Sequence, residues 1–175
     1  ARDQIKFGIL NAEFGIWNVI HPGSHAFGSR DVLYGGIGMN DCVFCKIAAG
    51  EISGLRVYED EHTLAFMDIA GDVDGHMLVI PKKHCISILD CDSDTLSHVI
   101  QTVKRVSNHL VDNCGYEGVD LMCANGESAG QTMPHLHIHI IPRRTNDGLG
   151  SKGEWPSFPG AKRDIREVYQ QFKML

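Results

Sequence analysis

Three histidines alternate with apolar residues in the second half of the chain, at His135, His137 and His139. Side chains two residues apart in a strand point to the same side, so a strand here would present the three imidazoles on one face, about 6.5–7 Å apart. The leucine and isoleucines between them would face the core. Neutral imidazole is a nucleophile and a metal ligand near neutral pH, so the pattern indicates covalent catalysis or metal binding. A polar sheet face without chemistry is the plainer alternative.

The segment before these histidines, Gly130-Gln131-Thr132-Met133-Pro134, favours a ligand site. Glycine lets the backbone approach a ligand closely, and a loop of this kind offers N–H donors to a phosphate. We therefore expect a phosphate-containing ligand rather than an inert histidine face.

A second group with possible chemistry is the Cys-x-x-Cys pair formed by Cys42 and Cys45. The pair could be a redox couple, two core cysteines, or half of a zinc site. A redox couple of the thioredoxin kind requires a strand–turn–helix context, which this part of the sequence supports poorly. The pair alone leaves a zinc site and two core cysteines open.

The elements that must position these residues follow from the periodicity of the sequence. Apolar residues at helical spacing predict one long helix, which Asp92 or Ser93 can cap at its start and Gly115 can end. Alternating or short apolar runs bounded by turn residues predict about five strands. The predicted strands are 55–59, 63–68, 77–80, 119–123 and 136–141, the long helix is 93–113, and a short helix spans 161–174. Strands in hairpin order with one inserted helix predict an α+β fold with an antiparallel sheet.

Length and composition place limits on the organisation and on the partners. The 175 residues fit one domain, at 39–150, with a glycine-rich N-terminal extension or leader at 1–38 and a tail at 151–175. The extension could be an added leader before Met39 or a segment that packs on the core or on a partner. A net charge of −6 argues against a nucleic-acid binder, and no window is long and apolar enough for a membrane span. Unevenly spaced cysteines favour a reduced, cytoplasmic setting.

Several motifs together resemble one known family. These are Cys42-Val43-Phe44-Cys45-Lys46-Ile47, Ala65-Phe66-Met67-Asp68-Ile69, the run from Gly75 to His84, and Ala129 to Arg143, which holds the His-x-His-x-His pattern. The chain is similar to the HIT (histidine triad) family, and in particular to its Hint branch and bacterial relatives. The similarity runs from Cys42 to about Arg143. It implies a HIT-like fold and a homodimer in which the long helix and an edge strand pair to form a continuous sheet.

The resemblance also implies roles for individual residues. His137 would attack the α-phosphorus of a nucleotide, and His139 would contact the phosphate and assist the leaving group. The other residues that the family pattern assigns are His76 as a fourth site histidine, Thr132 as a hydroxyl near the phosphate, Gly130 and Gln131 as backbone donors, Asp68 as the ribose-binding carboxylate, and Phe44, Ile47, Phe66 and Ile69 around the base.

The same resemblance assigns a structural zinc ion to Cys42, Cys45, His84 and His135. Two thiolates and two imidazoles are a normal structural zinc set that leaves no open position. The first histidine of the triad would then hold the metal instead of the substrate. No organic cofactor is expected.

One position departs from the family pattern. Where the family commonly has asparagine, six residues before Gly130, this sequence has Ala124 followed by Asn125. Asn125 would bind substrate only through a local shift of the chain. Trp155, in the tail, would help to select the substrate from the partner subunit.

The function that the resemblance implies is hydrolysis or transfer at the α-phosphate of a purine nucleotide through a nucleotidyl-histidine. A purine nucleoside phosphoramidase that releases AMP or GMP is the leading interpretation. A dinucleoside polyphosphate hydrolase is the alternative, and a nucleotide- or zinc-binding regulatory module is a more distant one.

Overall fold

The structure is a computed structural model that describes residues 41–149 and 161–174. The expected N-terminal extension at 1–38 and Trp155 lie outside the described residues. None of the helices in the described part of the chain is long and apolar enough to cross a membrane.

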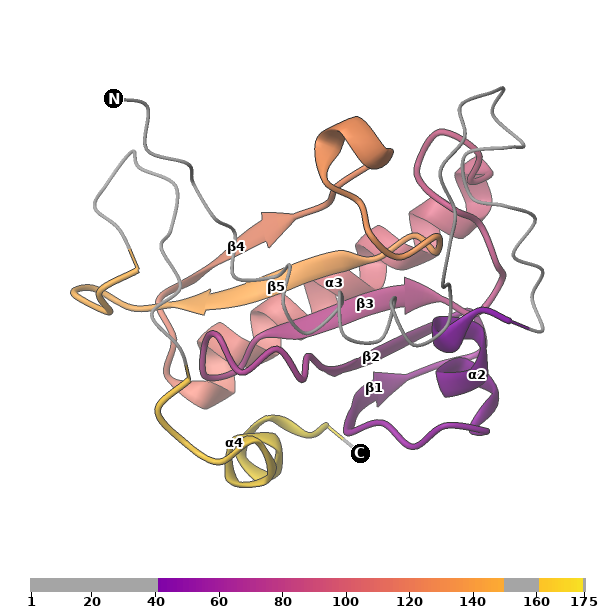
Figure 1. Cartoon of the computed structure of the whole chain (residues 1–175). Helices are drawn as coiled ribbons and strands as arrows, with labels where there is room; N and C mark the ends of the chain where they lie inside the picture. The colour runs from indigo at the N-terminus through magenta and orange to yellow at the C-terminus, as the bar shows by residue number, and fades with distance from the viewer. Residues whose placement is uncertain (1–40, 150–160, 175) are drawn as a thin grey trace.

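The centre of the fold is one five-stranded antiparallel sheet (Figure 1). Its strands are β1 (Arg56–Glu59), β2 (Thr63–Met67), β3 (Met77–Pro81), β4 (Gly118–Met122) and β5 (Ile138–Arg143), in the spatial order β1-β2-β3-β5-β4. β4 forms one edge, and β5 lies between β4 and β3. The α+β fold with about five antiparallel strands is confirmed.

The long helix α3 (Ser93–Cys114) covers one face of the sheet and lies behind the strands in Figure 1. Asp92 accepts a hydrogen bond from the backbone N–H of Thr95 and so caps the first turn, and Gly115 ends the helix with a left-handed φ of 73°. The helix buries its apolar stripe, which includes Val99, Val103, Val106 and Leu110, against residues of the sheet.

Two apolar clusters lie on opposite faces of the sheet, because alternate residues of each strand point to opposite sides. Ala65 and Met67 of β2 belong to the cluster under α3, whereas Leu64 and Phe66 belong to the other cluster. Ile138 and Ile140 of β5 also face α3. The histidine that alternates with them, His139, therefore faces away from α3, toward the second cluster.

A short helix that the sequence did not predict, α2 (Val43–Ala49), covers this second face. Gly50 ends it with a φ of 81°, and Phe44 and Ile47 are its buried residues. The helix contains both residues between the cysteines, and Cys42 is its N-cap. The cysteine pair is thereby placed at the start of a helix.

The histidine strand begins later than predicted, at Ile138 instead of residue 136, so His135 and His137 precede it. The ladder between β3 and β5 ends at the pair formed by Val79 and Ile138. Beyond this pair, Pro81 has no N–H to donate, and its carbonyl oxygen lies 2.9 Å from His135 Nε2. Leu136 instead donates its N–H to Cys85 O, at 2.7 Å.

The C-terminal helix α4 (Ile165–Phe172) is shorter than the predicted 161–174 because Asp164 caps its start. Residues before it are held by the loop between β2 and β3: Ala161 donates to Gly71 O, and Asp74 accepts from the N–H groups of Lys162 and Arg163. Phe172 is fully buried against Gly75 of the same loop. The tail therefore packs against the loop that leads to His76.

A short 3-10 turn, η1 (Glu127–Ala129), precedes the histidine segment.

Candidate active site and metal centre

His137 lies in the extended segment just before β5, and only 3% of the residue is exposed. Its Nδ1 lies 2.7 Å from the carbonyl oxygen of His135. Because a carbonyl only accepts hydrogen bonds, Nδ1 carries the proton and Nε2 keeps a free lone pair. Burial lowers the pKa of His137, against the opposing effect of this hydrogen bond. The lowered pKa favours a neutral imidazole, whose Nε2 lone pair has the chemistry of a nucleophile.

His139 and His76 form a buried hydrogen-bonded pair beside His137. The ring centroids of His137 and His139 are 5.0 Å apart, and His139 Nδ1 lies 2.8 Å from His76 Nε2. Asp72 Oδ1 accepts a hydrogen bond from His76 Nδ1 at 2.7 Å. Asp68 Oδ2 lies 3.5 Å from His76 Nε2 and 3.8 Å from His139 Nδ1. Four of the residues that the sequence singled out, together with Asp72, thus meet at one place.

Asp72 is the site residue that the sequence analysis missed. It lies four residues before His76, on the loop between β2 and β3, and 7% of it is exposed. Burial opposes the ionisation of Asp72, but the hydrogen bond and the charge of His76 outweigh it and lower the pKa of this carboxyl. The signal in the sequence was an acidic residue close to a site histidine in an otherwise turn-forming segment.

Phe44 from α2 places an aromatic edge against the histidines. Its ring packs in T-shaped geometry against His137, with centroids 5.4 Å apart, and against His135, with centroids 5.9 Å apart. Phe44, Ile47 and Phe66 belong to the same buried cluster. Ile69, the fourth residue expected around a base, is 70% exposed and lies apart from this cluster, where with Asp68 it lines a recess beside α4.

The loop before the histidines contains Gly130, Gln131 and Thr132. Gly130 adopts a left-handed φ of 84°, and Thr132 is half-buried. The N–H of Gly130 donates to Glu127 O and that of Gln131 donates to Gly126 O. Both backbone donors expected for phosphate are therefore used inside the turn, and phosphate binding by them would require the turn to open.

Asn125 connects two loops. Its Oδ1 accepts from the N–H of Ile88 at 2.9 Å, and its Nδ2 donates to Cys123 O at 3.1 Å. Both ends of the amide are thus used for protein contacts, and neighbouring Ala124 has no side-chain polar group to offer.

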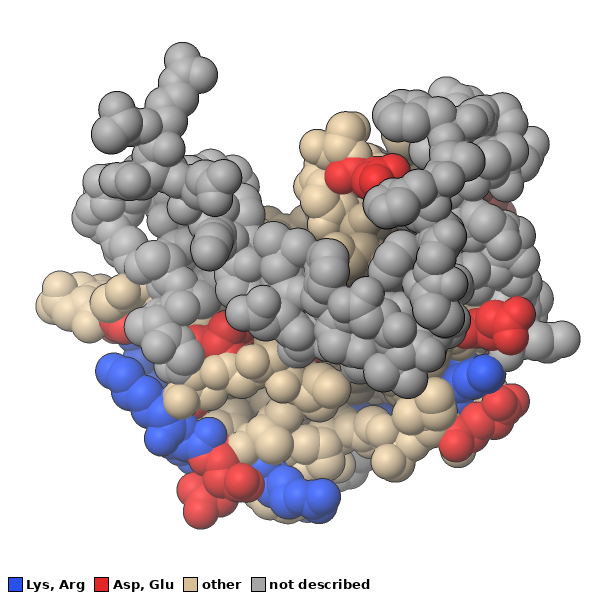
Figure 2. Space-filling model, viewed as in Figure 1, with Lys and Arg blue, Asp and Glu red and all other residues tan. Residues whose placement is uncertain are grey.

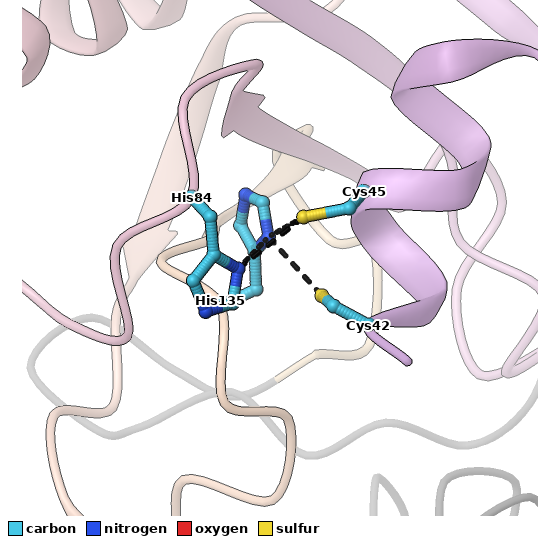
Figure 3. Close-up of side chains that lie close together, drawn as sticks. All are labelled: Cys42, Cys45, His84 and His135. Atoms are coloured by element: carbon cyan, nitrogen blue, oxygen red, sulfur yellow. Dashed lines mark hydrogen bonds between the residues drawn. The ribbon is translucent and has the colours of Figure 1, made fainter. Parts of the chain in front are cut away.

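Cys42, Cys45, His84 and His135 converge on one point, as Figure 3 shows. One possible ligand atom from each residue lies within 4.8 Å of all the others. Both sulfurs contact His135 Nδ1, at 3.3 Å from Cys42 Sγ and 3.5 Å from Cys45 Sγ. His84 Nδ1 lies 3.3 Å from both Cys45 Sγ and His135 Nδ1. The set that the resemblance implied is brought together by α2, the segment after β3, and the segment before β5.

The chemistry of this set suits a divalent metal ion with a preference for sulfur and nitrogen. His135 Nε2 donates to Pro81 O, so Nδ1 turns its lone pair toward the two sulfurs. Burial and the neighbouring Cys42 raise the pKa of Cys45 to about 12, and burial lowers the pKa of His135 to about 4. Both shifts reflect the cost of charge in this buried place, which a bound cation would offset by stabilising the thiolates. Two sulfurs and two imidazole nitrogens are a structural zinc set.

Charged side chains on the described part of the surface are of mixed sign. Figure 2 shows acidic and basic groups around the margins of a mostly uncharged area on this face. The cysteines outside this cluster, at 85, 91, 114 and 123, are free thiols.

Comparison with known proteins agrees with the geometry. A model of the HIT domain matches residues 49–146. An uncharacterized HIT-like protein of Borreliella burgdorferi is 44% identical over 116 residues, which cover 65% of this chain and 84% of that protein. The adenosine 5'-monophosphoramidase hnt1 of Schizosaccharomyces pombe is 34% identical over 130 residues, which cover 74% of this chain and 94% of that protein.

Among solved structures, a zinc-bound histidine triad family protein from Mycobacterium smegmatis superposes with a TM-score of 0.68 and 30% sequence identity. The match covers 78% of this chain and 93% of that one. With the domain match, the relatives, the five-stranded sheet and the clustered histidines taken together, this chain belongs to the HIT, or histidine triad, family.

Proposed function

We propose that the protein hydrolyses purine nucleoside phosphoramidates through a nucleotidyl-histidine formed on His137. The observation that carries the proposal is the hydrogen bond from His137 Nδ1 to His135 O, at 2.7 Å. It leaves Nε2 unprotonated. Because His137 is buried, water has little access to this nitrogen and does not weaken it as a nucleophile. The name of the yeast relative, an adenosine 5'-monophosphoramidase, supports this substrate class.

The reaction would proceed in two displacements. His137 Nε2 forms a bond to the α-phosphorus as the bond from phosphorus to the leaving amine breaks. Water then attacks the phosphorus, and the bond to His137 breaks to release the nucleoside monophosphate. Two easier steps replace one difficult step. His139 lies beside His137 and His76, where it can pass a proton to the amine and accept one from water.

The remaining site residues would bind and orient the substrate. Asp68 is partly accessible, with 12% of its side chain exposed, and a carboxylate can accept hydrogen bonds from both ribose hydroxyls. Phe44, Ile47 and Phe66 provide the apolar surface for a base, and Ile69 would cover the base from its exposed position. Thr132, Gly130 and Gln131 would contact phosphate oxygens after the turn rearranges.

We infer further that Cys42, Cys45, His84 and His135 hold a structural zinc ion. The convergence of four sulfur and nitrogen ligand atoms within 4.8 Å supports this, as does the zinc-bound relative of known structure. Such an ion would supply folding stability and would fix the segment from residue 135 to residue 137. Elemental analysis of protein purified without chelators tests it.

A homodimer remains a proposal, and the exposed apolar residues of α3 and β4 support it. Leu121 on the edge strand β4 is 46% exposed, and Ile100 and Val111 on α3 are 51% and 39% exposed. An edge strand presents unpaired backbone groups that a second copy can pair. Analytical ultracentrifugation at micromolar concentration should give the mass of two chains. The cytoplasmic location expected from cysteine usage also stays a prediction.

The experiment that tests the function is mass spectrometry of the full chain mixed with a slowly reacting adenosine phosphoramidate. We expect an added adenylyl group on the peptide that contains His137. An adduct on another residue, or turnover without an adduct under conditions that trap one on a known nucleotidyl-histidine enzyme, would contradict the mechanism. Faster turnover of diadenosine polyphosphates than of the phosphoramidate would instead favour the dinucleoside polyphosphate hydrolase.

A further inference from the structure

A continuous chain of three buried hydrogen-bonding side chains runs from the loop between β2 and β3 into the candidate active site. Asp72 Oδ1 lies 2.7 Å from His76 Nδ1, and His76 Nε2 lies 2.8 Å from His139 Nδ1. The exposed fractions of the three residues are 7%, 2% and 5%. Water therefore has little access to the chain of hydrogen bonds.

The carboxylate at the start fixes the protons along the chain. Ionised Asp72 only accepts hydrogen bonds, so His76 Nδ1 must donate. His76 Nε2 then accepts from His139 Nδ1. With Nδ1 of His139 committed to donation, Nε2 of His139 is the imidazole nitrogen at which a proton can arrive or leave.

A positive charge on the buried pair of His76 and His139 is unfavourable, and the carboxylate of Asp72 would stabilise it. Burial lowers the pKa of His139, as do the neighbouring His137 and His76. Among the described residues, the charged and titratable groups that face the pair of histidines include Asp72, Asp68 at 3.5 and 3.8 Å, and His137. A carboxylate hydrogen-bonded to His76 stabilises a positive charge that is shared along the chain.

Asp72 is poorly explained by a role in stability alone. Its Oδ1 accepts from His76 and from the N–H of Val73, but its Oδ2 is buried without a hydrogen-bond partner among the residues that the structure describes. A buried carboxylate with one unsatisfied oxygen is unfavourable for folding. Its hydrogen-bonding capacity is directed toward His76, which points to a role in the site.

We propose that Asp72 is a positioning residue that acts through His76 to hold a proton on His139 Nε2 for the departing amine. The proposal rests on the proposed function. As the bond from His137 Nε2 to phosphorus forms, the bond from phosphorus to the amine nitrogen breaks, and that nitrogen takes the proton from His139 Nε2. In the second step water bonds to phosphorus, gives a proton back to His139 Nε2, and the electron pair of the broken bond returns to His137.

The role predicts a dependence on the leaving group. An alkylamine leaves only when protonated, whereas 4-nitrophenolate leaves without a proton. For D72N we expect kcat with an adenosine 5'-alkylphosphoramidate to fall about 100-fold, the lower range for general acid catalysis, with KM within about threefold. For the 4-nitrophenyl ester of AMP we expect kcat/KM, which reports the steps up to formation of the nucleotidyl-histidine, to fall less than about threefold. A merely structural role of Asp72 would lower both rates equally.

Asp74 provides the matched control. It is an acidic residue of the same loop, but it accepts from the backbone N–H groups of Lys162 and Arg163 and takes no part in the chain. We expect D74N to change the two substrates by the same factor. If D72N folds poorly, D72A takes its place in the test. D72A removes both carboxylate oxygens, and we expect the same contrast between the two substrates.

A second readout does not depend on turnover. Nitrogen NMR of histidine-labelled, substrate-free full chain should show His76 protonated at Nδ1 in the wild type and shifted toward the other tautomer in D72N, with thermal stability equal or higher. Equal loss on both substrates, no loss on either, or an unchanged His76 tautomer would overturn the proposal. Absence of a His137 adduct in the wild type would instead contradict the proposed function and leave the tautomer result standing.

Discussion

The carbonyl oxygen of His135 accepts a hydrogen bond from Nδ1 of His137, while the imidazole of His135 turns its Nδ1 to the cysteine sulfurs. One residue therefore belongs to both halves of the site. The side chain of His135 contacts the two cysteine sulfurs and Pro81 O. Its backbone carbonyl fixes the tautomer of His137. A disturbance of the cluster of cysteines and histidines should reach His137 through His135, and also through Phe44 of α2, whose ring packs against both histidines.

Removal of the metal should accordingly lower both stability and turnover. We expect C45S to lose stoichiometric zinc, to unfold at a temperature lower by several degrees, and to lose most of its phosphoramidase activity, because binding of a metal to the folded state stabilises that state. Elemental analysis, thermal unfolding and steady-state kinetics measure the three effects. C123S, which changes a half-buried cysteine outside the cluster, is the control and should keep its metal. Full zinc content in C45S would exclude this ligand set.

Loss of the His137 imidazole should separate chemistry from binding. We expect H137A to lower kcat by at least about 1,000-fold, since it removes the group that forms the covalent bond. The affinity for AMP should change by no more than about threefold, because Asp68 and the apolar cluster remain. Steady-state kinetics and calorimetry check the two expectations. H62A changes a half-exposed histidine and should behave as the wild type. Near wild-type turnover in H137A would exclude it as the nucleophile.

The strands and the long helix could be predicted from the sequence because their patterns are local. The apolar stripe, Asp92 and Gly115 together define α3 within one residue of its observed end, and alternating or short apolar runs define β1 to β4. The start of β5 could not be predicted in this way. It depends on the absence of an N–H at Pro81 and on a hydrogen bond between residues 81 and 135, which lie far apart in the sequence.

The site residues also divide into those that local sequence patterns reveal and those that only the fold brings together. The histidines and the cysteine pair could be found from their spacing and from the family resemblance. Asp72 could not, because an acidic residue in a turn is ordinary until the fold buries it against His76. Helix α2 was missed because its seven residues are too few for a clear period.

A methyl group at Gly75 should disrupt the contact between the tail and the loop that holds His76. Gly75 has a φ of 88°, and an added Cβ would overlap the ring of Phe172 and lie 3.0 Å from Pro142 Cγ. We expect G75A to lower the free energy of unfolding by about 2–4 kcal/mol, from backbone strain and overpacking together. Urea denaturation measures it. G71A, at a φ of 66° with open space around the added Cβ, carries only the backbone strain and should lose about 1 kcal/mol. Equal losses in the two variants would show that packing against Phe172 is unimportant.

The ion pair at the end of β5 predicts how stability depends on acid. Arg143 donates from Nε to Asp147 Oδ2 at 2.8 Å and from Nη2 to Oδ1 at 3.2 Å. These hydrogen bonds lower the pKa of Asp147 to about 2, from an ordinary value of 3.8. A folded-state pKa below the unfolded value means that the contribution is complete above about pH 4 and is lost as the pH falls toward 2.

D147N should therefore be less stable than the wild type at neutral pH, by about 1 kcal/mol for a pair near the surface, and the difference should vanish as the pH falls from 4 to 2. Urea denaturation at a series of pH values measures the difference between the two proteins, which removes the titration of the other carboxyls. E61Q alters a side chain that is 87% exposed and should follow the wild type throughout.

Since Arg143 is the last residue of the strand that carries His139, a larger loss of activity than of stability in D147N would indicate that the ion pair of Arg143 and Asp147 also positions this histidine. A stability difference that grows toward low pH would have the wrong sign and would exclude the ion pair as its cause.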